Sequence, residues 1–243
     1  MTQSASAIRA AGLGPARSLA PSAAFWAAML AASALGTNLG DYWTDQLSLG
    51  LAASAAPLAL ASLALIVADR FRPSEALFWL AIVILRAMAT NIGDFLTDEL
   101  GIGRPALTLA LGAATLAAGW LTTRGASPRI DARYWVAMAI GGVFGTVGGD
   151  LVSHAVGLPF ATAGLSALLV AAIAVRAAAA PAAALGYWAI VLAERAAGTA
   201  AGDFLAEERG HALALGLPGA MAIYAGLLLA LLWVRSRRVL ANG

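Results

Sequence analysis

Residues 37–41 read Thr-Asn-Leu-Gly-Asp, and their frame of Thr, Gly and Asp returns three more times along the chain. In each copy the Thr stands four positions before the Asp and the Gly stands one position before it. The motif Asp residues are 53, 56 and 53 residues apart, and they are Asp41, Asp94, Asp150 and Asp203. An aromatic residue and a Trp precede them at a constant distance, as Phe25-Trp26, Phe78-Trp79, Tyr134-Trp135 and Tyr187-Trp188. Four copies of one frame indicate an internal repeat.

The composition points to a membrane. Of the 243 residues 61% are hydrophobic and 12% are charged, and the mean hydropathy is +0.82. Soluble domains average about 45–50% apolar and about 25% charged residues. This composition argues against a soluble enzyme and against a nucleic-acid binder. The chain has no Cys, which excludes disulfides, thiolate metal sites and cysteine nucleophiles.

Eight apolar segments are long enough to span a bilayer, which takes about 20 residues. Helices satisfy their own backbone in lipid, so we predict an all-α polytopic membrane protein with eight transmembrane helices. We expect the spans at 21–47, 51–67, 76–100, 105–121, 134–156, 159–175, 182–207 and 215–234.

The repeat divides the chain into a tail and four two-span units. We expect a tail at 1–20, followed by repeats at 21–73, 74–128, 129–180 and 181–243. Because each unit has two spans, all copies run the same way through the membrane, which is a parallel duplication. Arg stands eight positions before the motif Asp in the second and fourth copies, as Arg86 and Arg195, whereas Ser33 and Gly142 stand there in the others. The chain therefore looks like two related halves.

Arginine sets the expected orientation. With eight spans, one side holds eleven Arg residues and the other holds Arg104 and Arg209. This positive-inside bias places both termini in the cytoplasm. A cleaved signal peptide is disfavoured, because the first apolar segment carries the same motif as the three later ones.

The pattern resembles a family of bacterial membrane proteins known as a four-fold repeat of unknown function, whose repeat has two transmembrane regions and a characteristic Trp. Trp26, Trp79, Trp135 and Trp188 match that Trp. The resemblance implies the eight-helix architecture and a bacterial cytoplasmic (inner) membrane. It implies no activity.

Helical spacing turns the motif into a polar stripe. Residues four apart share a helix face, which groups Thr37, Asp41 and Asp45; Thr90, Asp94 and Asp98; Thr146, Asp150 and His154; and Thr199, Asp203 and Glu207. A neighbouring stripe is small: Gly36 and Gly40, Ala89 and Gly93, Gly145 and Gly149, Gly198 and Gly202. Small residues let helices approach closely in lipid. We therefore expect the motif helices at the centre and the other four at the periphery.

Ionisable groups within spans are usually functional. Clustered carboxylates need a counterion or protons, and their oxygens suit hard divalent cations. The predicted metal ligands are Asp41, Asp45, Asp94, Asp98, Asp150, His154, Asp203 and Glu207, supported by Thr37, Asn38, Thr90, Asn91, Thr146 and Thr199. The alternative is structural, with Asp and Thr bonding between helices and the outer acids forming solvated helix ends.

Three further charges fall near the expected middle of the membrane: Arg86, Glu194 and Arg195. Neighbours in sequence do not share a helix face, so we expect Glu194 and Arg195 to find other partners. The predicted pairing joins Arg86 or Arg195 to a motif Asp or to Glu194 across helices, as a gate or as a static ion pair.

These features favour a secondary transporter or exporter of inorganic cations, with a divalent metal such as Mn²⁺ preferred and protons as a possible coupling ion. The alternatives are a structural or regulatory membrane protein, a small organic-ion carrier using Arg86 and Arg195, and an intramembrane aspartyl protease, which needs two Asp in distinct motifs rather than four equivalent copies. No Walker motif or nucleophile triad is visible, so we do not expect ATP-driven pumping. We expect no enzyme, and no cofactor beyond a divalent metal ion. The expected partners are the bilayer and a cation or proton, without nucleic acid; the sequence leaves the oligomeric state open.

Overall fold

The computed structural model describes residues 21–48, 50–124, 127–178, 184–208 and 212–241. Their helices are α2 (Ala23–Leu47), α3 (Leu51–Phe71), α4 (Glu75–Asp94), α5 (Arg104–Thr122), α6 (Ala132–Val156), α7 (Leu158–Ala178), α8 (Ala184–Ala206) and α9 (Gly216–Ala241). A π-helical turn, η1 (Phe95–Glu99), extends α4. Two-residue strands β1 (Thr123–Arg124) and β2 (Ser127–Pro128) pair between α5 and α6.

The described helices coincide with the expected spans to within a few residues at most ends. Seven of them, with α4 and η1 counted together, are long and apolar enough to cross a membrane. This indicates a multi-pass membrane protein. We expected eight spans, and seven of the described helices meet this criterion of length and composition. The exception is α8, because Glu194, Arg195 and Asp203 lower its hydropathy.

Three motif helices begin with the same cap. A side-chain oxygen accepts a hydrogen bond from the backbone N–H three residues on, at Ser22 for α2, Ser74 for α4 and Asp131 for α6. Ser and Asp are favoured caps because they satisfy a backbone donor of the first turn. The caps therefore start the helices three or four residues before the aromatic–Trp pairs.

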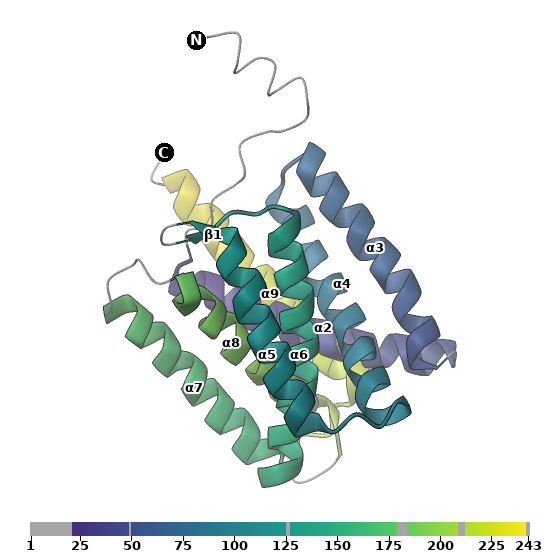
Figure 1. Ribbon diagram of the computed structural model, residues 1–243. Coiled ribbons are helices and arrows are strands. Elements are labelled where there is room, and N and C mark those ends of the chain that lie inside the picture. Colours follow the sequence, from purple (N-terminus) through teal and green to yellow (C-terminus); the bar gives the residue numbers. More distant parts are fainter. Residues whose placement is uncertain (1–20, 49, 125–126, 179–183, 209–211, 242–243) are drawn as a thin grey trace.

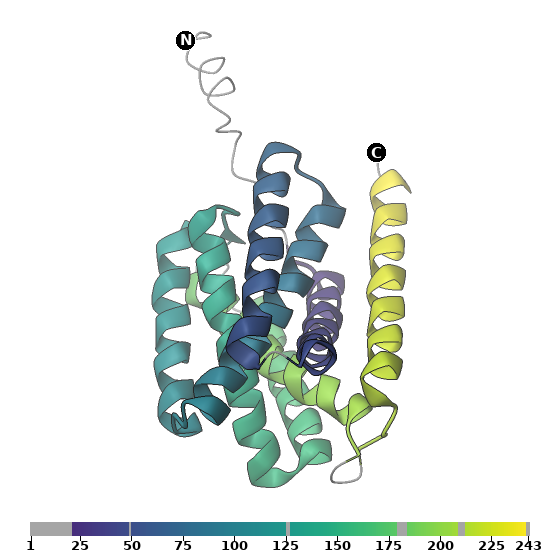
Figure 2. The same ribbon diagram turned by 90° about the vertical axis from the view of Figure 1, so that its right-hand side faces the viewer.

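The four motif helices form a closed inner ring. α2 packs on α4, α4 on α6, α6 on α8, and α8 returns to α2 (Figures 1 and 2). Each outer helix packs mainly on the motif helix of the next copy: α3 on α4, α5 on α6, α7 on α8, and α9 on α2. The last outer helix thus closes the circle, and Figure 2 shows α9 standing along one side of the molecule.

Burial separates the two layers. More than half of the apolar stretch of α2, α4 and α6 is buried, against less than a quarter for each outer helix. The outer helices expose large apolar side chains, among them Leu60, Leu109, Phe160 and Leu229. A surface of this kind suits lipid rather than water.

Eight aromatic side chains close one end of the inner ring. In each copy the first aromatic residue contacts its own Trp edge-on and also the Trp of the next copy. The ring centroids of these second contacts are 5.2–5.7 Å apart, and the pairs are Phe25–Trp79, Phe78–Trp135, Tyr134–Trp188 and Tyr187–Trp26. Equivalent positions of all four helices therefore meet at one level, and the Trp residues are buried packing elements.

The small residues bring the inner helices together. A Cβ on Gly36 would lie 2.6 Å from the Cβ of Arg86, and a Cβ on Gly145 would lie 2.6 Å from that of Arg195. A Cβ on Gly149 would meet Thr199 at 2.7 Å. Gly198 makes the same kind of approach to Ser33 and closes the ring between α8 and α2.

Candidate functional site

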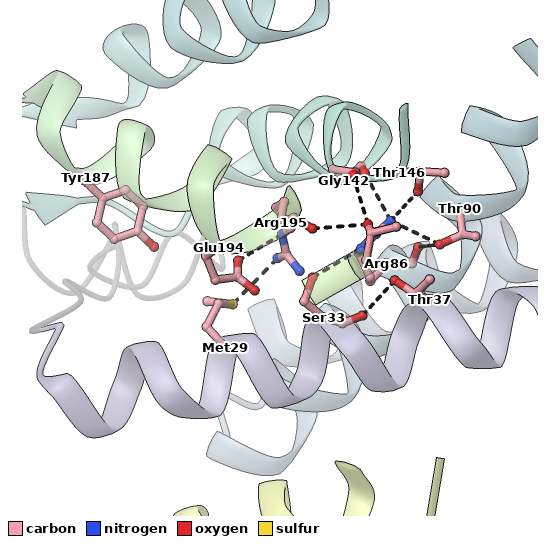
Figure 3. Close-up of polar contacts among 12 residues, drawn as sticks. Met29, Ser33, Thr37, Arg86, Thr90, Gly142, Thr146, Tyr187, Glu194 and Arg195 are labelled. Atoms are coloured by element: carbon pink, nitrogen blue, oxygen red, sulfur yellow. Dashed lines mark hydrogen bonds and ion pairs between the residues drawn. The ribbon is translucent and has the colours of Figure 1, made fainter. Parts of the chain in front are cut away.

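Arg86 of α4 lies in the middle of the inner ring and is 1% exposed. Its Nη1 donates to Thr90 Oγ1 (3.1 Å), to Thr146 Oγ1 (2.8 Å) and to the carbonyl oxygen of Gly142 (3.1 Å) (Figure 3). Its Nη2 donates to Thr199 Oγ1, and its Nε donates to Ser33 Oγ at 3.3 Å. One guanidinium therefore contacts all four inner helices.

The motif threonines are oriented to accept these bonds. Thr37 and Thr90 each donate their hydroxyl proton to the carbonyl four residues earlier, at 3.1–3.2 Å. The hydroxyl of Thr199 has two carbonyl acceptors in reach, that of Gly145 at 2.9 Å and that of Arg195, four residues earlier, at 3.2 Å. A bond to the carbonyl four residues earlier is common for Thr inside helices, and it leaves the oxygen lone pairs free to accept. We call Thr37, Thr90, Thr146 and Thr199 the threonine ring. Arg86 bonds three of its four members.

The expected ion pair between Arg86 and a carboxylate is not among its contacts within the described residues. Its hydrogen bonds go to hydroxyls and a backbone carbonyl instead. The guanidinium has five donors in a planar fork, so several neutral acceptors can surround it at once.

Glu194 and Arg195 form the second buried group, and here the prediction from helix faces was wrong. Arg195 Nε lies 3.5 Å from Oε2 of Glu194, its own neighbour in sequence (Figure 3). Arg195 also directs Nη2 toward Met29 Sδ at 3.6 Å. Both side chains are long enough to bend toward one another. The contact that Arg195 makes to a neighbouring helix is to the thioether of Met29, so Glu194 is the carboxylate closest at hand.

The motif Asp residues lie one helical turn beyond the threonine ring, about 6 Å along the axis at 1.5 Å per residue. Asp203 is buried, and the other three are half-buried. Their charges interact: Asp41 with Asp150 and Arg86, Asp94 with Asp41 and Asp150, and Asp203 with Asp150 and Asp41. The four carboxylates thus share one end of the ring axis, opposite the aromatic end.

The outer acidic positions are more dispersed. Asp45, Asp98 and His154 are exposed, and Glu207 is half-buried. Asp98 accepts a bond from Arg104 Nη2 at 2.6 Å, and His154 Nδ1 lies 2.7 Å from the carbonyl oxygen of Asp150. Local partners therefore hold Asp98 and His154.

Asn38 and Asn91 lie between inner helices, apart from Arg86. A Cβ on Gly40 would lie 3.0 Å from Asn91 Oδ1, and one on Gly202 would lie 3.0 Å from Asn38 Oδ1. Asn91 donates to Ser54 Oγ at 2.9 Å. Within the described residues, neither side-chain atom of the buried Asn38 has a hydrogen-bond partner.

The described residues contain no group of three or more His, Asp and Glu side chains that could hold a metal ion. All eight predicted ligands are described, so they do not form a ready-made metal centre. What the structure brings together is the threonine ring with Arg86 inside it and the four motif carboxylates one turn away.

Ser33, Met29 and Gly142 contact the buried arginines, and none was predicted as a site residue. Ser33 and Gly142 do occupy the position that is Arg in the other two copies. That alignment is the sequence signal that could have found them. Met29 has no such signal.

Residues 24–73 and 186–239 match a family described as Repeat of Unknown Function (DUF347). The matched segments hold the first and fourth copies of the motif, with Trp26 and Trp188. The resemblance to a repeat family of unknown function is thereby confirmed, and the description assigns no activity. No curated protein and no solved structure matches the chain.

Proposed function

We propose that this chain, whose first and fourth copies match a repeat family of unknown function, is a secondary transporter of inorganic cations. The observation that carries the proposal is the stacking of two layers on one axis. Four motif carboxylates lie at one end, and the threonine ring with Arg86 lies one turn deeper. Carboxylates in a span attract cations, and a buried guanidinium opposes their passage.

The proposed number of spans and the proposed orientation in the membrane follow from the helix packing and from the distribution of Arg along the sequence. All eight helices cross the membrane, with α8 shielded from lipid by its neighbours in the inner ring. The excess of Arg at the aromatic end makes that end cytoplasmic, so the motif Asp residues face outward. By resemblance, the membrane is the bacterial inner membrane.

Arg86 acts as the gate in this scheme. While it holds Thr146 and Thr199, its charge stands directly below the carboxylates and blocks the axis. A cation bound by the motif Asp residues would weaken the attraction of those carboxylates for Arg86, so cation binding and the position of Arg86 are linked. Divalent metals such as Mn²⁺ fit the hard oxygen ligands, but the carboxylates must move together to hold one.

Cation binding tests the proposal. Purified protein in detergent is heated with a panel of monovalent and divalent cations, and the same is done for Asp41→Asn, Asp94→Asn, Asp150→Asn and Asp203→Asn. A ligand of the folded state raises the melting temperature by mass action. We expect one class of cation to stabilise the wild type and to lose that effect in the four variants.

Asp131→Asn is the matched control, because Asp131 caps α6 at the opposite end and Asn is an equally good cap. It should keep the wild-type response to cations. A stabilisation that is equal in all variants, or absent for every cation, would argue against a cation site at the motif.

A second candidate is a carrier of small anions. Arg86 favours it, because this buried cation bonds only neutral groups among the described residues and could accept an anion. The same experiment separates the two: stabilisation by chloride or nitrate that survives the four Asp→Asn changes supports the anion carrier.

A further inference from the structure

A buried polar group lies between the aromatic end and the threonine ring, and the proposed cation path does not use it. Glu194 and Arg195 are 0% and 1% exposed. Within the described residues, no well-formed hydrogen bond reaches either carboxylate oxygen of Glu194, although the Ser33 side chain lies close enough to interact with it. Nε and Nη1 of Arg195 donate no hydrogen bond. The 3.5 Å approach of Arg195 Nε to Glu194 is their main compensation. A buried pair satisfied this poorly is costly.

Arg195 and Arg86 occupy equivalent positions on opposite helices of the inner ring. Both stand eight residues before a motif Asp. Both have their Cβ against a glycine of the preceding helix, Gly36 for Arg86 and Gly145 for Arg195, at the same 2.6 Å for a built Cβ. Their charges interact across the axis. The threonine ring holds one of them, Arg86.

The partners that Arg195 would find in the threonine ring follow from the order of the helices. Arg86 bonds the Thr of its own helix, of the next helix and of the opposite helix, which are Thr90, Thr146 and Thr199. For Arg195 on α8, the Thr of its own helix is Thr199, that of the next helix is Thr37 and that of the opposite helix is Thr90. Thr37 is also the ring member that Arg86 leaves unbonded. Exchange of the two arginines would therefore trade Thr146 for Thr37.

One residue distinguishes the two arginines. Arg195 follows Glu194, whereas Arg86 follows Leu85 at the equivalent position. The carboxylate of Glu194 lies 3.5 Å from Nε of Arg195, whereas the neighbour Leu85 offers Arg86 no ion-pair partner. This difference gives Arg195 a local ion-pair partner that Arg86 lacks, and Arg86 is the arginine found in the threonine ring.

We propose that Glu194 is a proton-binding site whose occupancy selects which arginine, Arg86 or Arg195, sits in the threonine ring. A proton taken from water neutralises Glu194 and releases Arg195. The released guanidinium then competes with Arg86, which must withdraw because the two like charges repel. This inference deepens the proposed transport function, because the proton bound by Glu194 would be the coupling ion. Only that coupling role rests on the proposed function.

Several titratable and polar groups face Glu194 and influence whether its carboxyl group binds a proton. Arg195 and Tyr187 are on its own helix, Arg86 reaches it from α4, and Ser33 faces it from α2. Tyr134 of α6 pairs its hydroxyl with that of Tyr187 at 3.3 Å.

The test compares Thr37→Val with Thr146→Val, which each remove one ring hydroxyl. With Glu194 charged, at alkaline pH, Thr146→Val should lower the melting temperature more than Thr37→Val. In a Glu194→Gln background, which mimics the protonated acid, the order should reverse. Acidification should reverse the order in the presence of Glu194 and leave it unchanged in Glu194→Gln.

Glu208→Gln is the control, since Glu208 is exposed at the far end of the same helix region, and it should keep the order seen with Glu194. The same order of the two valine variants in both backgrounds and at both pH values would overturn the proposal. Should Glu194→Gln fail to fold, the pH comparison alone decides. These measurements need no transported ion, so their failure is distinguishable from a failure of cation transport.

Discussion

Arg86 shows how a charge is kept inside this bundle at the residue scale. Its donors meet hydroxyl and carbonyl oxygens rather than a carboxylate. Such a shell satisfies the guanidinium without fixing it in a strong ion pair, because each bond is made to a neutral group. A charge that must move during function is better held in this way than by a buried carboxylate, whose loss is costly.

The two buried asparagines give a prediction at this scale. Asn91 donates to Ser54, whereas Asn38 has no partner within the described residues. Asn91→Ala should therefore cost about 1 kcal/mol more in unfolding free energy than Asn38→Ala, which removes an unsatisfied group. Thermal or denaturant unfolding in detergent measures the difference. Equal losses would mean that Asn38 has a partner of similar strength in the folded protein.

At this scale the sequence identified the residues better than their contacts. Polar and charged residues stood out by their place in apolar spans: those of the motif, and Arg86, Glu194 and Arg195. The pairing that we predicted for the two arginines was wrong. Helix-face geometry does not predict that Arg195 bends toward its neighbour Glu194, since long side chains reach beyond their own face. Helix-face geometry also gave no reason to expect hydroxyl groups, rather than carboxylates, as the hydrogen-bond partners of Arg86.

The inner helices depend on glycine at the element scale. Each inner helix approaches the next through the small residues of its motif. Arg or Thr side chains lie against the glycines of α2, α4 and α6, whereas Ser33 and Asn38 lie against those of α8. In lipid, packing and interhelical hydrogen bonds hold helices together. Close approach is therefore what lets one guanidinium reach threonines on three helices.

Alanine at these glycines should destabilise the protein. A Cβ on Gly36 or Gly145 would lie 2.6 Å from an arginine Cβ, so Gly36→Ala and Gly145→Ala should each cost about 1–3 kcal/mol through overpacking. Gly164→Ala on α7 is the control, because nothing lies within 4 Å of the added Cβ there. It should be neutral or gain up to about 1 kcal/mol from helix propensity. Similar effects at all three sites would contradict the proposed helix contacts.

Hydrophobic length predicted the helices well because a span must be long and apolar. The same criterion fails for α8, whose charges are buried within the protein. Sequence also could not show that α3 packs on α4 or α9 on α2, since a plain Ala- and Leu-rich helix carries no mark of its neighbour. The closure of the ring depends on that pairing.

The whole molecule has one polarity, with aromatic contacts at one end of the inner ring and carboxylates at the other. The absence of Cys makes its orientation directly measurable. Gly103→Cys, in the exposed loop before α5, should react with a membrane-impermeant maleimide in intact cells. Ser236→Cys, exposed near the end of α9, should react only after the membrane is opened. The reverse pattern would invert the proposed orientation.

Transport itself is the most direct test of the central claim, that the four motif carboxylates serve cation movement through the inner ring. Purified protein is reconstituted into liposomes, and uptake of the cation that stabilises it is followed down an imposed gradient. The account predicts uptake by the wild type and by Asp131→Asn, and at least a tenfold loss in each motif Asp→Asn variant, equivalent to about 1.4 kcal/mol. Absence of uptake for every cation tested, or uptake unchanged in all four motif variants, would contradict it.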